Sequence, residues 1–325
     1  MRLHRRRFLG LGASVIVAPA LPRPGIAASY PNRPVHIVIG FPPGGTLDSV
    51  SRLIGQRLGE RLGQQFVIDS KPGAGSNIAA EYVLRAEPDG YTLLACTSTN
   101  TLNQSLYQHL DFDFSGDATA IASVMLTPAV MEVTPGLPAK SVAEFIAYAK
   151  AHPGEINMAS PGVGTFHHVA GELFMMTTGT KLVHGPYHGE APALIDLLAG
   201  RVQVMFTLLP SSIMHIKAGD LRALGVMTAK RIDELPDIPT VAETVPGYEA
   251  TSWEGLIGPR GVPADIVQSL NDGVAVALAD PEMKRQMTAL GGQVFPGSSA
   301  DFGRFIAAET EKWRKVIQAA NIRVE

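Results

Sequence analysis

Two glycine turns carry residue types that suit the binding of a small anion. The first runs from Phe41 to Asp48, between an apolar run and an amphipathic helical pattern. Its glycines would let a ligand approach the backbone closely, and the first turn of the next helix has unpaired N–H groups at the positive end of its dipole. Helix capping by Thr46 or Asp48 is an equally simple interpretation of an isolated turn. The candidate ligand contacts in this turn are Phe41, Pro43, Gly44, Gly45, Thr46 and Asp48.

A second glycine turn, Gly162-Val163-Gly164-Thr165, opens another helical pattern and has the same character. The polar run Thr97-Ser98-Thr99-Asn100 follows an apolar run, so we expect it at the carboxyl end of a strand. Its hydroxyl and amide groups suit hydrogen bonding to a ligand, and Thr97 is the candidate contact. An ordinary solvated loop is the alternative interpretation.

Nucleotide and hydrolase sites find little support. A Walker loop needs Lys and then Ser or Thr after its last glycine, but Gly45 is followed by Thr46 and Leu47. The glycine cluster at Gly73 has Ile78 where a dinucleotide fingerprint needs a small residue. No Gly-x-Ser-x-Gly motif of a hydrolase occurs. We therefore expect no cofactor and no catalytic residue.

Four histidines lie close together in the sequence, at His167, His168, His184 and His188. Residues four apart share a face only on a helix, and a Gly-Pro pair separates His184 from His188. Loop and core histidines are therefore expected in place of a metal site. His167 and His168 fall in the first turn of an expected helix. Of the two, we expect His168 to point toward the bound ligand.

Short apolar runs alternate with helical patterns, which indicates parallel sheets covered by helices. From residue 35 to about 99 the order is strand, helix 48–63, strand 66–68, helix 76–87 and strand 91–96. After Pro128 the pattern repeats, with strands near 156–159, 181–183, 202–206 and 221–227 and helices near 165–178, 191–199 and 211–218. Ligands bind at the carboxyl ends of such strands, where both glycine turns fall. Two such turns facing each other across a cleft are typical of a clamshell binding protein.

The two expected lobes are residues 30–125 with 255–325, and residues 126–254. The chain changes lobe near 126 and returns near 254, because helices beginning at Pro263, Pro281 and Ser299 are expected to pack back on the first lobe. With 325 residues and 46% hydrophobic side chains, the chain can fill one large core or two modest ones.

Charge and cysteine content exclude several classes of protein. The formal net charge of −3 provides no basic surface for nucleic acid or an anionic membrane. The single cysteine, Cys96, excludes an internal disulfide and a cysteine-cluster metal site. Because Cys96 ends an apolar run, a buried strand thiol is expected.

The first 29 residues have the pattern of a twin-arginine export signal. Arg5-Arg6-Arg7 precedes an apolar run from Leu11 to Ala20 and a small-residue exit near Ala28. An uncleaved anchor is the rival interpretation, but this run is too short to span a bilayer. The mature protein is therefore expected to begin near residues 28–30 and to work in the periplasm.

Ordered motifs extend over almost the whole of the expected mature chain. They are Phe41-Pro42-Pro43-Gly44-Gly45 with Asp48, Pro72-Gly73-Ala74-Gly75, Pro88-Asp89-Gly90-Tyr91-Thr92, Gly164-Thr165 with His168, Pro186-Tyr187 with Gly189, Pro192-Ala193, Asp196-Leu197-Leu198-Ala199-Gly200, Ile216-Lys217-Ala218-Gly219 and Pro236-Asp237-Ile238-Pro239-Thr240. On these motifs the chain resembles the Bug family, the extracytoplasmic solute receptors of tripartite tricarboxylate transporters. The resemblance implies a type II periplasmic-binding-protein fold, with two doubly wound α/β lobes around a ligand cleft.

The resemblance also implies the positions of the ligand contacts. It places a ligand carboxylate at the backbone of residues 41–46, with Asp48 shaping the turn. The contacts implied from the facing lobe are Ser160, Gly164, Thr165, His168, Tyr187 and Gly189. Relatives often carry Lys or Arg at the position of His188 and Asp at the position of Thr207, so both positions could alter the choice of ligand.

These observations predict a non-enzymatic, exported solute-binding protein that captures a small organic carboxylate by lobe closure. Its expected partners are the ligand and the membrane permease subunits of a tripartite tricarboxylate transporter, and we expect a monomer. Two alternatives remain open from the sequence. One is an exported enzyme that acts on a similar acid, and the other is a receptor that signals to a sensor protein.

Overall fold

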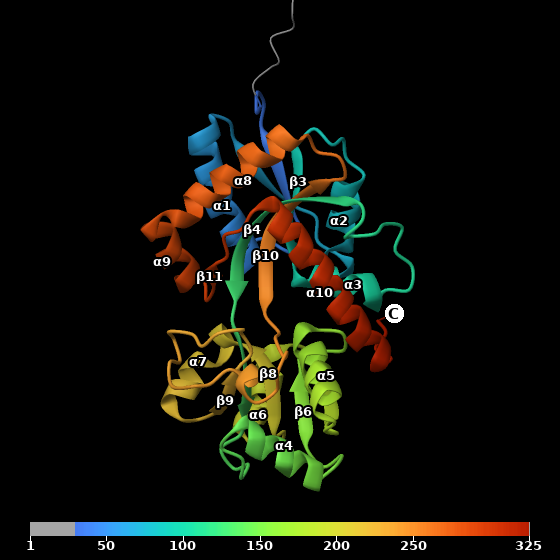
Figure 1. Ribbon diagram of the computed structural model, residues 1–325, viewed down its shortest axis with the longest axis vertical. Coiled ribbons are helices and arrows are strands. Elements are labelled where there is room, and N and C mark those ends of the chain that lie inside the picture. The colour runs from blue at the N-terminus through green and yellow to red at the C-terminus, as the bar shows by residue number, and fades with distance from the viewer. Residues whose placement is uncertain (1–29, 325) are drawn as a thin grey trace, which may run out of the picture.

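The computed structural model describes residues 30–324, which form two α/β lobes stacked along the long axis of the molecule (Figure 1). The expected export signal at residues 1–29 lies outside the described residues. Within residues 30–324, no helix has both the length and the apolar character needed to cross a membrane.

The first lobe contains a six-stranded sheet in the order β11-β4-β10-β3-β1-β2. Its strands are β1 (Val35–Ile39), β2 (Phe66–Ser70), β3 (Thr92–Thr97), β4 (Ala118–Thr127), β10 (Ser252–Pro259) and β11 (Gln293–Val294). Strands β1, β2 and β3 pair in parallel, whereas β10 runs antiparallel to both β3 and β4. The accompanying helices are α1 (Thr46–Leu62), η1 (Ala74–Ser76), α2 (Asn77–Leu84), α3 (Ser98–Leu106), α8 (Ala264–Ala279), α9 (Pro281–Ala289) and α10 (Ser299–Ala319).

Helices cover both faces of this sheet. In β1, Ile37 and Ile39 pack into a core shared with α1 and α8, whereas Val38 packs on the other face with α2 and α10. Because successive side chains of a strand point to opposite faces, a strand covered on both sides is apolar along its whole length. This burial explains the apolar run from Ile37 to Ile39 in β1, whereas His36 near its start is exposed.

The second lobe contains a five-stranded sheet in the order β7-β6-β8-β5-β9. Its strands are β5 (Ala129–Val133), β6 (Asn157–Ser160), β7 (Val183–Pro186), β8 (Val204–Leu208) and β9 (Arg222–Val226). The helices are α4 (Val142–Ala151), α5 (Phe166–Thr178), α6 (Glu190–Leu198), α7 (Leu209–Ala218) and η2 (Val241–Glu243). Helices α4 and α5 pack on one face, and α6 and α7 pack on the other.

The chain crosses between the two sheets twice. Strand β4 ends at Thr127, and β5 begins in the other sheet at Ala129, so Pro128 alone separates them. The chain returns before β10, which begins at Ser252. The chain leaves the first sheet at the end of β4 and returns to it at the start of β10. These two strands are paired neighbours, so the two crossings start from adjacent strands.

Helix α10, which we expected to pack back on the first lobe, contacts both lobes. Its first half packs with that lobe through Phe302 and Ile306, whereas Trp313, Val316 and Ile317 belong to the core of the second lobe. The helix runs from one lobe to the side of the other, next to α5 (Figure 1). A helix of 21 residues is about 30 Å long, so its apolar stripe extends beyond the first lobe.

Two local expectations also need correction. The polar run 97–100, for which a solvated loop was the alternative, instead opens helix α3, because Thr97 forms a capping box with Asn100. Residues Gly185 and Pro186, expected in a loop, end strand β7. This strand lies at the sheet edge, where a proline without an N–H group is tolerated.

Candidate functional site

A hollow of about 430 Å³ lies between the two lobes. Its lining comes from the turn after β1, from α3, from the loop that opens α5, from the start of α6 and from the C-terminus. The lining residues are Phe41, Ser98, Thr99, Leu102, Asn103, Leu106, Tyr107, Pro161, Val163, Gly164, Thr165, Phe166, His167, Glu190, Leu208, Ser252 and Val324. The volume fits a small organic molecule.

The loop at Gly164 brings the two lobes into contact beside this hollow. Gly164 has φ +77°, and a Cβ atom there would meet Leu106 of α3 and Val324 of the C-terminus at 3.2–3.3 Å. Its backbone N–H donates to Nδ1 of His168 (3.1 Å). Glycine therefore serves both the left-handed backbone and the close approach of the other lobe.

Thr165 is the N-cap residue of helix α5 and forms no side-chain cap. The hydroxyl of Thr165 donates to the carbonyl of Gly162 (2.8 Å), so its proton is already used within the loop. The N–H groups in the first turn of α5 therefore remain without a side-chain acceptor. They form the positive end of a helix dipole at the wall of the hollow.

The turn before α1 has a similar form. Gly45 is the N-cap, with φ −82° and no side-chain cap, whereas the preceding Gly44 has φ +92°. Pro43, Gly44, Gly45 and Thr46 are exposed, and Phe41 lines the hollow. The buried Asp48 accepts the Gly44 N–H (3.0 Å), and its hydrogen bond to Arg52 lowers the Asp48 pKa. Asp48 therefore fixes the turn by holding the Gly44 N–H, and the backbone of Gly45 and Thr46 stays exposed.

Glu190, which the sequence interpretation did not single out, is the one carboxylate among the lining residues of this hollow in the described part of the chain. Its Oε1 accepts hydrogen bonds from Thr207 Oγ1 (2.6 Å) and His167 Nε2 (3.2 Å). Burial alone would raise the Glu190 pKa, but hydrogen bonds from His167, Thr207 and Ser211 outweigh it and lower the pKa to about 2. Glu190 is therefore ionised at neutral pH.

The two adjacent histidines are placed the other way round from the expectation. His167 lines the hollow, and His168 is buried with its ring stacked on His184 at 3.7 Å. The Nε2 of His184 lies 2.6 Å from the hydroxyl of the fully buried Ser160. Burial and the nearby His168 lower the His184 pKa to about 4. This cluster supports the loop from beneath, since Ser160 also donates to the carbonyl of Gly162 (3.0 Å).

Other candidate residues surround the hollow without lining it. Thr97 caps α3, and the Gly189 N–H donates to the carbonyl of Pro161 (3.1 Å). The Tyr187 hydroxyl donates to Asp196 (2.8 Å). Thr207 is fully buried beneath Glu190. Of the candidate residues, Phe41, Gly164 and Thr165 line the hollow directly.

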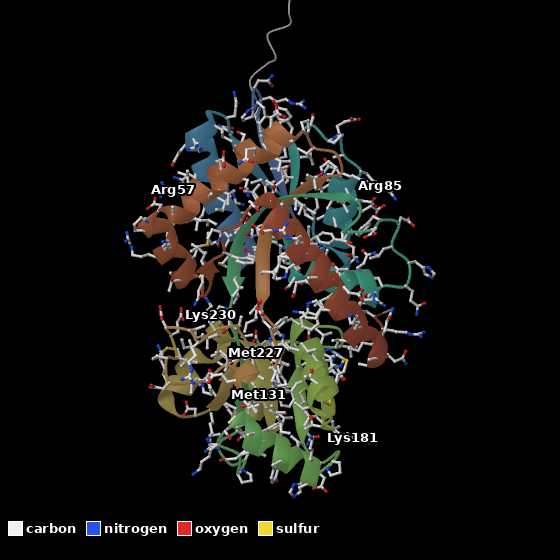
Figure 2. All side chains as sticks on the ribbon, in the orientation of Figure 1. Arg57, Arg85, Met131, Lys181, Met227 and Lys230 are labelled. Carbon is white, nitrogen blue, oxygen red and sulfur yellow. The ribbon has the colours of Figure 1, made fainter. Side chains whose placement is uncertain are left out.

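Among residues 30–324, no Lys or Arg lines the hollow. Arg57 and Arg85 lie on the outer sides of the first lobe, and Lys181 lies toward the far end of the second (Figure 2). Within the same residues, no group of three His, Cys, Asp or Glu side chains is arranged to hold a metal ion. Backbone N–H groups and hydroxyls are therefore the available partners for an anion.

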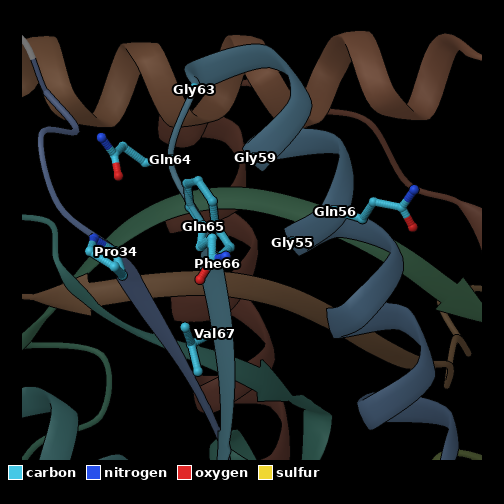
Figure 3. Close-up of a pocket in the computed structure, with 9 residues that line it drawn as sticks. All are labelled: Pro34, Gly55, Gln56, Gly59, Gly63, Gln64, Gln65, Phe66 and Val67. Carbon is cyan, nitrogen blue, oxygen red and sulfur yellow. The ribbon is translucent and has the colours of Figure 1, made fainter.

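A second hollow, of about 740 Å³, lies between the end of α1 and the start of β2 (Figure 3). Gly59 and Gly63 line it on the helix side, and Pro34 and Gln65 line it next to the amino ends of β1 and β2. The carbonyl end of a helix disfavours anions. Ligands of open α/β sheets bind at the carboxyl ends of the strands, so the interlobe hollow is the better candidate.

Comparison with known proteins agrees with this geometry. The chain matches the family model described as tripartite tricarboxylate transporter family receptor over residues 50–322. Protein BugT of Bordetella pertussis is 30% identical over 326 residues, which cover 99% of this chain and 100% of BugT.

Two solved structures share the fold. R. palustris Rpa4515 with adipate is 39% identical, with a TM-score of 0.72 over 91% of this chain and 100% of that one. A TctC solute-binding protein from Polaromonas without ligand is 26% identical, with a TM-score of 0.82 over 90% of this chain and 100% of that one.

The family and these neighbours are solute-binding receptors and not enzymes, as the sequence predicted. The expected two-lobed periplasmic-binding-protein fold and the resemblance to Bug proteins are both confirmed. The chain therefore belongs to the receptor family of the tripartite tricarboxylate transporters.

Proposed function

We propose that this protein is a periplasmic receptor that captures a small organic carboxylate between its lobes and delivers it to a membrane permease. The observation that carries the proposal is the interlobe hollow, which meets the uncapped first turn of α5 and the turn before α1. Membership of the receptor family and the adipate held by Rpa4515 support a carboxylate as the ligand.

The ligand carboxylate is bound by backbone N–H groups at the two helix N-termini. Gly45 leaves these groups of α1 open to a ligand, and the first turn of α5 offers its own uncapped N–H groups. The hydroxyls of Ser98 and Thr99 lie in the same lining and add hydrogen-bonding groups from the first lobe. With contacts from both lobes, ligand binding favours the closed arrangement.

The partners and the cellular address are part of the same proposal, which membership of the receptor family supports. The permease subunits of a tripartite tricarboxylate transporter receive the ligand, and the receptor works as a monomer. Residues 1–29 direct export by the twin-arginine route and are removed. N-terminal sequencing of the exported protein would locate the cleavage, and an intact residue 1 would contradict it.

A ligand screen tests this function. We expect one or more carboxylates, from a panel of di- and tricarboxylates, aromatic acids and amino acids, to raise the melting temperature. A ligand at one hundred times its Kd adds about 2.7 kcal/mol to the free energy of unfolding. A panel without any stabilising carboxylate would contradict the proposal.

Two glycine variants then locate the site. A Cβ atom at Gly45 or at Gly136 meets nothing within 4 Å, and neither residue has a positive φ, so both tolerate valine. We expect Gly45→Val to weaken binding about tenfold or more, because its side chain covers the backbone that the ligand approaches. Gly136→Val, at an exposed position between β5 and α4, should bind as the wild type does. Equal affinities in calorimetry would exclude the turn before α1 as a contact.

A further inference from the structure

The interlobe hollow has a negative corner. Glu190 is the first residue of α6, its side chain is about one-third exposed, and no Lys or Arg among residues 30–324 lines the same space. His167 and Thr207 hold its Oε1 and fix the carboxylate in place. A carboxylate side chain is unexpected in a site that binds anions. Its presence restricts the charge that the ligand can carry next to Glu190.

The neighbouring histidine holds the carboxylate through one ring nitrogen. The Nε2 atom of His167 faces Oε1 of Glu190 at 3.2 Å. The Nδ1 atom of His167 is buried and has no hydrogen-bond partner among the described residues.

The carboxylate also has room for another donor. A carboxylate offers about four acceptor positions, and His167, Thr207 and Ser211 supply three donors. A purely anionic ligand would bring its charge close to Glu190 in a partly desolvated space, where repulsion is stronger than in water. A ligand with a positive group at this position would instead form a charge-assisted hydrogen bond.

We propose that the ligand is a zwitterionic carboxylate whose ammonium group binds Glu190 while its carboxylate binds the N-terminus of α5. His167 belongs to the first turn of α5 and touches Glu190, so the two subsites lie side by side. The two charged groups of the ligand are therefore close together, as in an α-amino acid. This inference rests on the proposed carboxylate receptor and specifies the class of its ligand.

A matched set of acids tests the inference by calorimetry. Succinate, malate and aspartate share a carbon skeleton and differ in carrying hydrogen, hydroxyl or ammonium at one carbon. Glutarate with glutamate, and adipate with 2-aminoadipate, extend the comparison to longer skeletons. We expect the amino acid to bind about tenfold to one hundredfold more tightly than its plain counterpart, because the added hydrogen bond joins two charged groups.

Two substitutions connect this preference with Glu190. Glu190→Gln keeps an acceptor for Thr207 and removes the charge, so the ratio of affinities should fall to within about threefold. Glu155→Gln removes the same charge from an exposed position. Glu155 precedes the start of β6, whereas the loop that opens α5 follows the end of β6. This control should keep the wild-type ratio. Circular dichroism would first establish that both variants are folded.

The possible results separate the inference from the proposed function. If no acid binds, the carboxylate receptor function fails, and the inference fails with it. If acids bind but the plain acid or malate equals the amino acid in the wild type, only the inference fails. An unchanged ratio in Glu190→Gln would likewise overturn it. Should that variant not fold, the wild-type ratios alone decide.

Discussion

Two buried glutamates make stability depend on pH. Burial raises the pKa of Glu132 to about 8. A hydrogen bond from Ser212 lowers this pKa, and the charge of Glu190 raises it. Burial also raises the pKa of Glu254 to about 8. An ordinary glutamate has a pKa of about 4.5, so the folded state binds these protons more tightly than the unfolded state does. Both groups are therefore neutral near pH 6.

We expect the free energy of unfolding to fall as pH rises from about 4.5 to 8. The stability that the neutral groups provide is complete below their unfolded pKa and is lost as pH rises through the folded value. The slope is at most about 1.4 kcal/mol per pH unit for each group. Urea unfolding between pH 5 and 8 measures it.

Glu132→Gln and Glu254→Gln serve as controls for this dependence. Each amide stays neutral at every pH, so each variant should show a flatter profile than the wild type. The titration of histidines contributes equally to the profiles of the wild type and both variants. Subtracting each variant's profile from that of the wild type therefore removes this contribution. Profiles that run parallel in wild type and variants would contradict the assignment.

The site shows why some residues could not be predicted from the sequence. Successive residues of a helix point about 100° apart, so one of His167 and His168 had to turn away from the cleft. Which one does so depends on how α5 packs on its sheet. Glu190 resembles an ordinary acidic residue in a first helical turn. Its partners His167 and Thr207 are 23 and 17 residues away and meet it only in the folded lobe.

At the scale of elements, hydrophobic periodicity predicted most helices and strands, because nearly all of them bury one face or both. Helix α3 was missed because Ser, Thr and Asn dominate its sequence, Ser98 to Leu106, and these residues favour turns and caps. Its polar residues Ser98, Asn100, Thr101 and Asn103 are nevertheless buried, and Asn103 donates to the Gly75 carbonyl (2.7 Å). Tertiary contacts thus overrode local propensity.

Helix α10 joins the two lobes through Trp313. This side chain is fully buried, its ring lies 6.3 Å from that of Phe166, and its indole N–H donates to Glu309 (2.9 Å). We expect Trp313→Ala to lower the free energy of unfolding by about 3–5 kcal/mol, because it leaves a cavity in the core of the second lobe.

Trp313→Phe is the matched control for this helix. It keeps a buried ring and loses the hydrogen bond to Glu309, so its effect should be smaller. Chemical denaturation followed by circular dichroism would measure both variants. A loss below about 1 kcal/mol for Trp313→Ala would show that the end of α10 contributes little to the second lobe.

At the scale of the whole molecule, the described residues join the lobes by covalent crossings and by packing. The crossings lie at Pro128 and before Ser252, and the packing includes that of α10 on α5 and that of the Gly164 loop on α3. A hinge motion concentrates rotation in a few residues at the ends of elements. Because α10 packs on both lobes, closure must carry the helix with one lobe and move its contacts with the other. The contacts of Gly164 with Leu106 and Val324 also join the lobes, so closure must move them as well.

We expect saturating ligand to reduce the radius of gyration measured by small-angle X-ray scattering. The reason is that α1 and α3 belong to one lobe and α5 and α6 to the other, so a ligand that contacts both sets gains hydrogen bonds only when the lobes approach. Gly45→Val provides the control, because it should bind poorly and keep its radius at the same ligand concentration. An unchanged radius in the wild type, at a ligand concentration that calorimetry shows to be saturating, would instead indicate a rigid site or one formed by a single lobe.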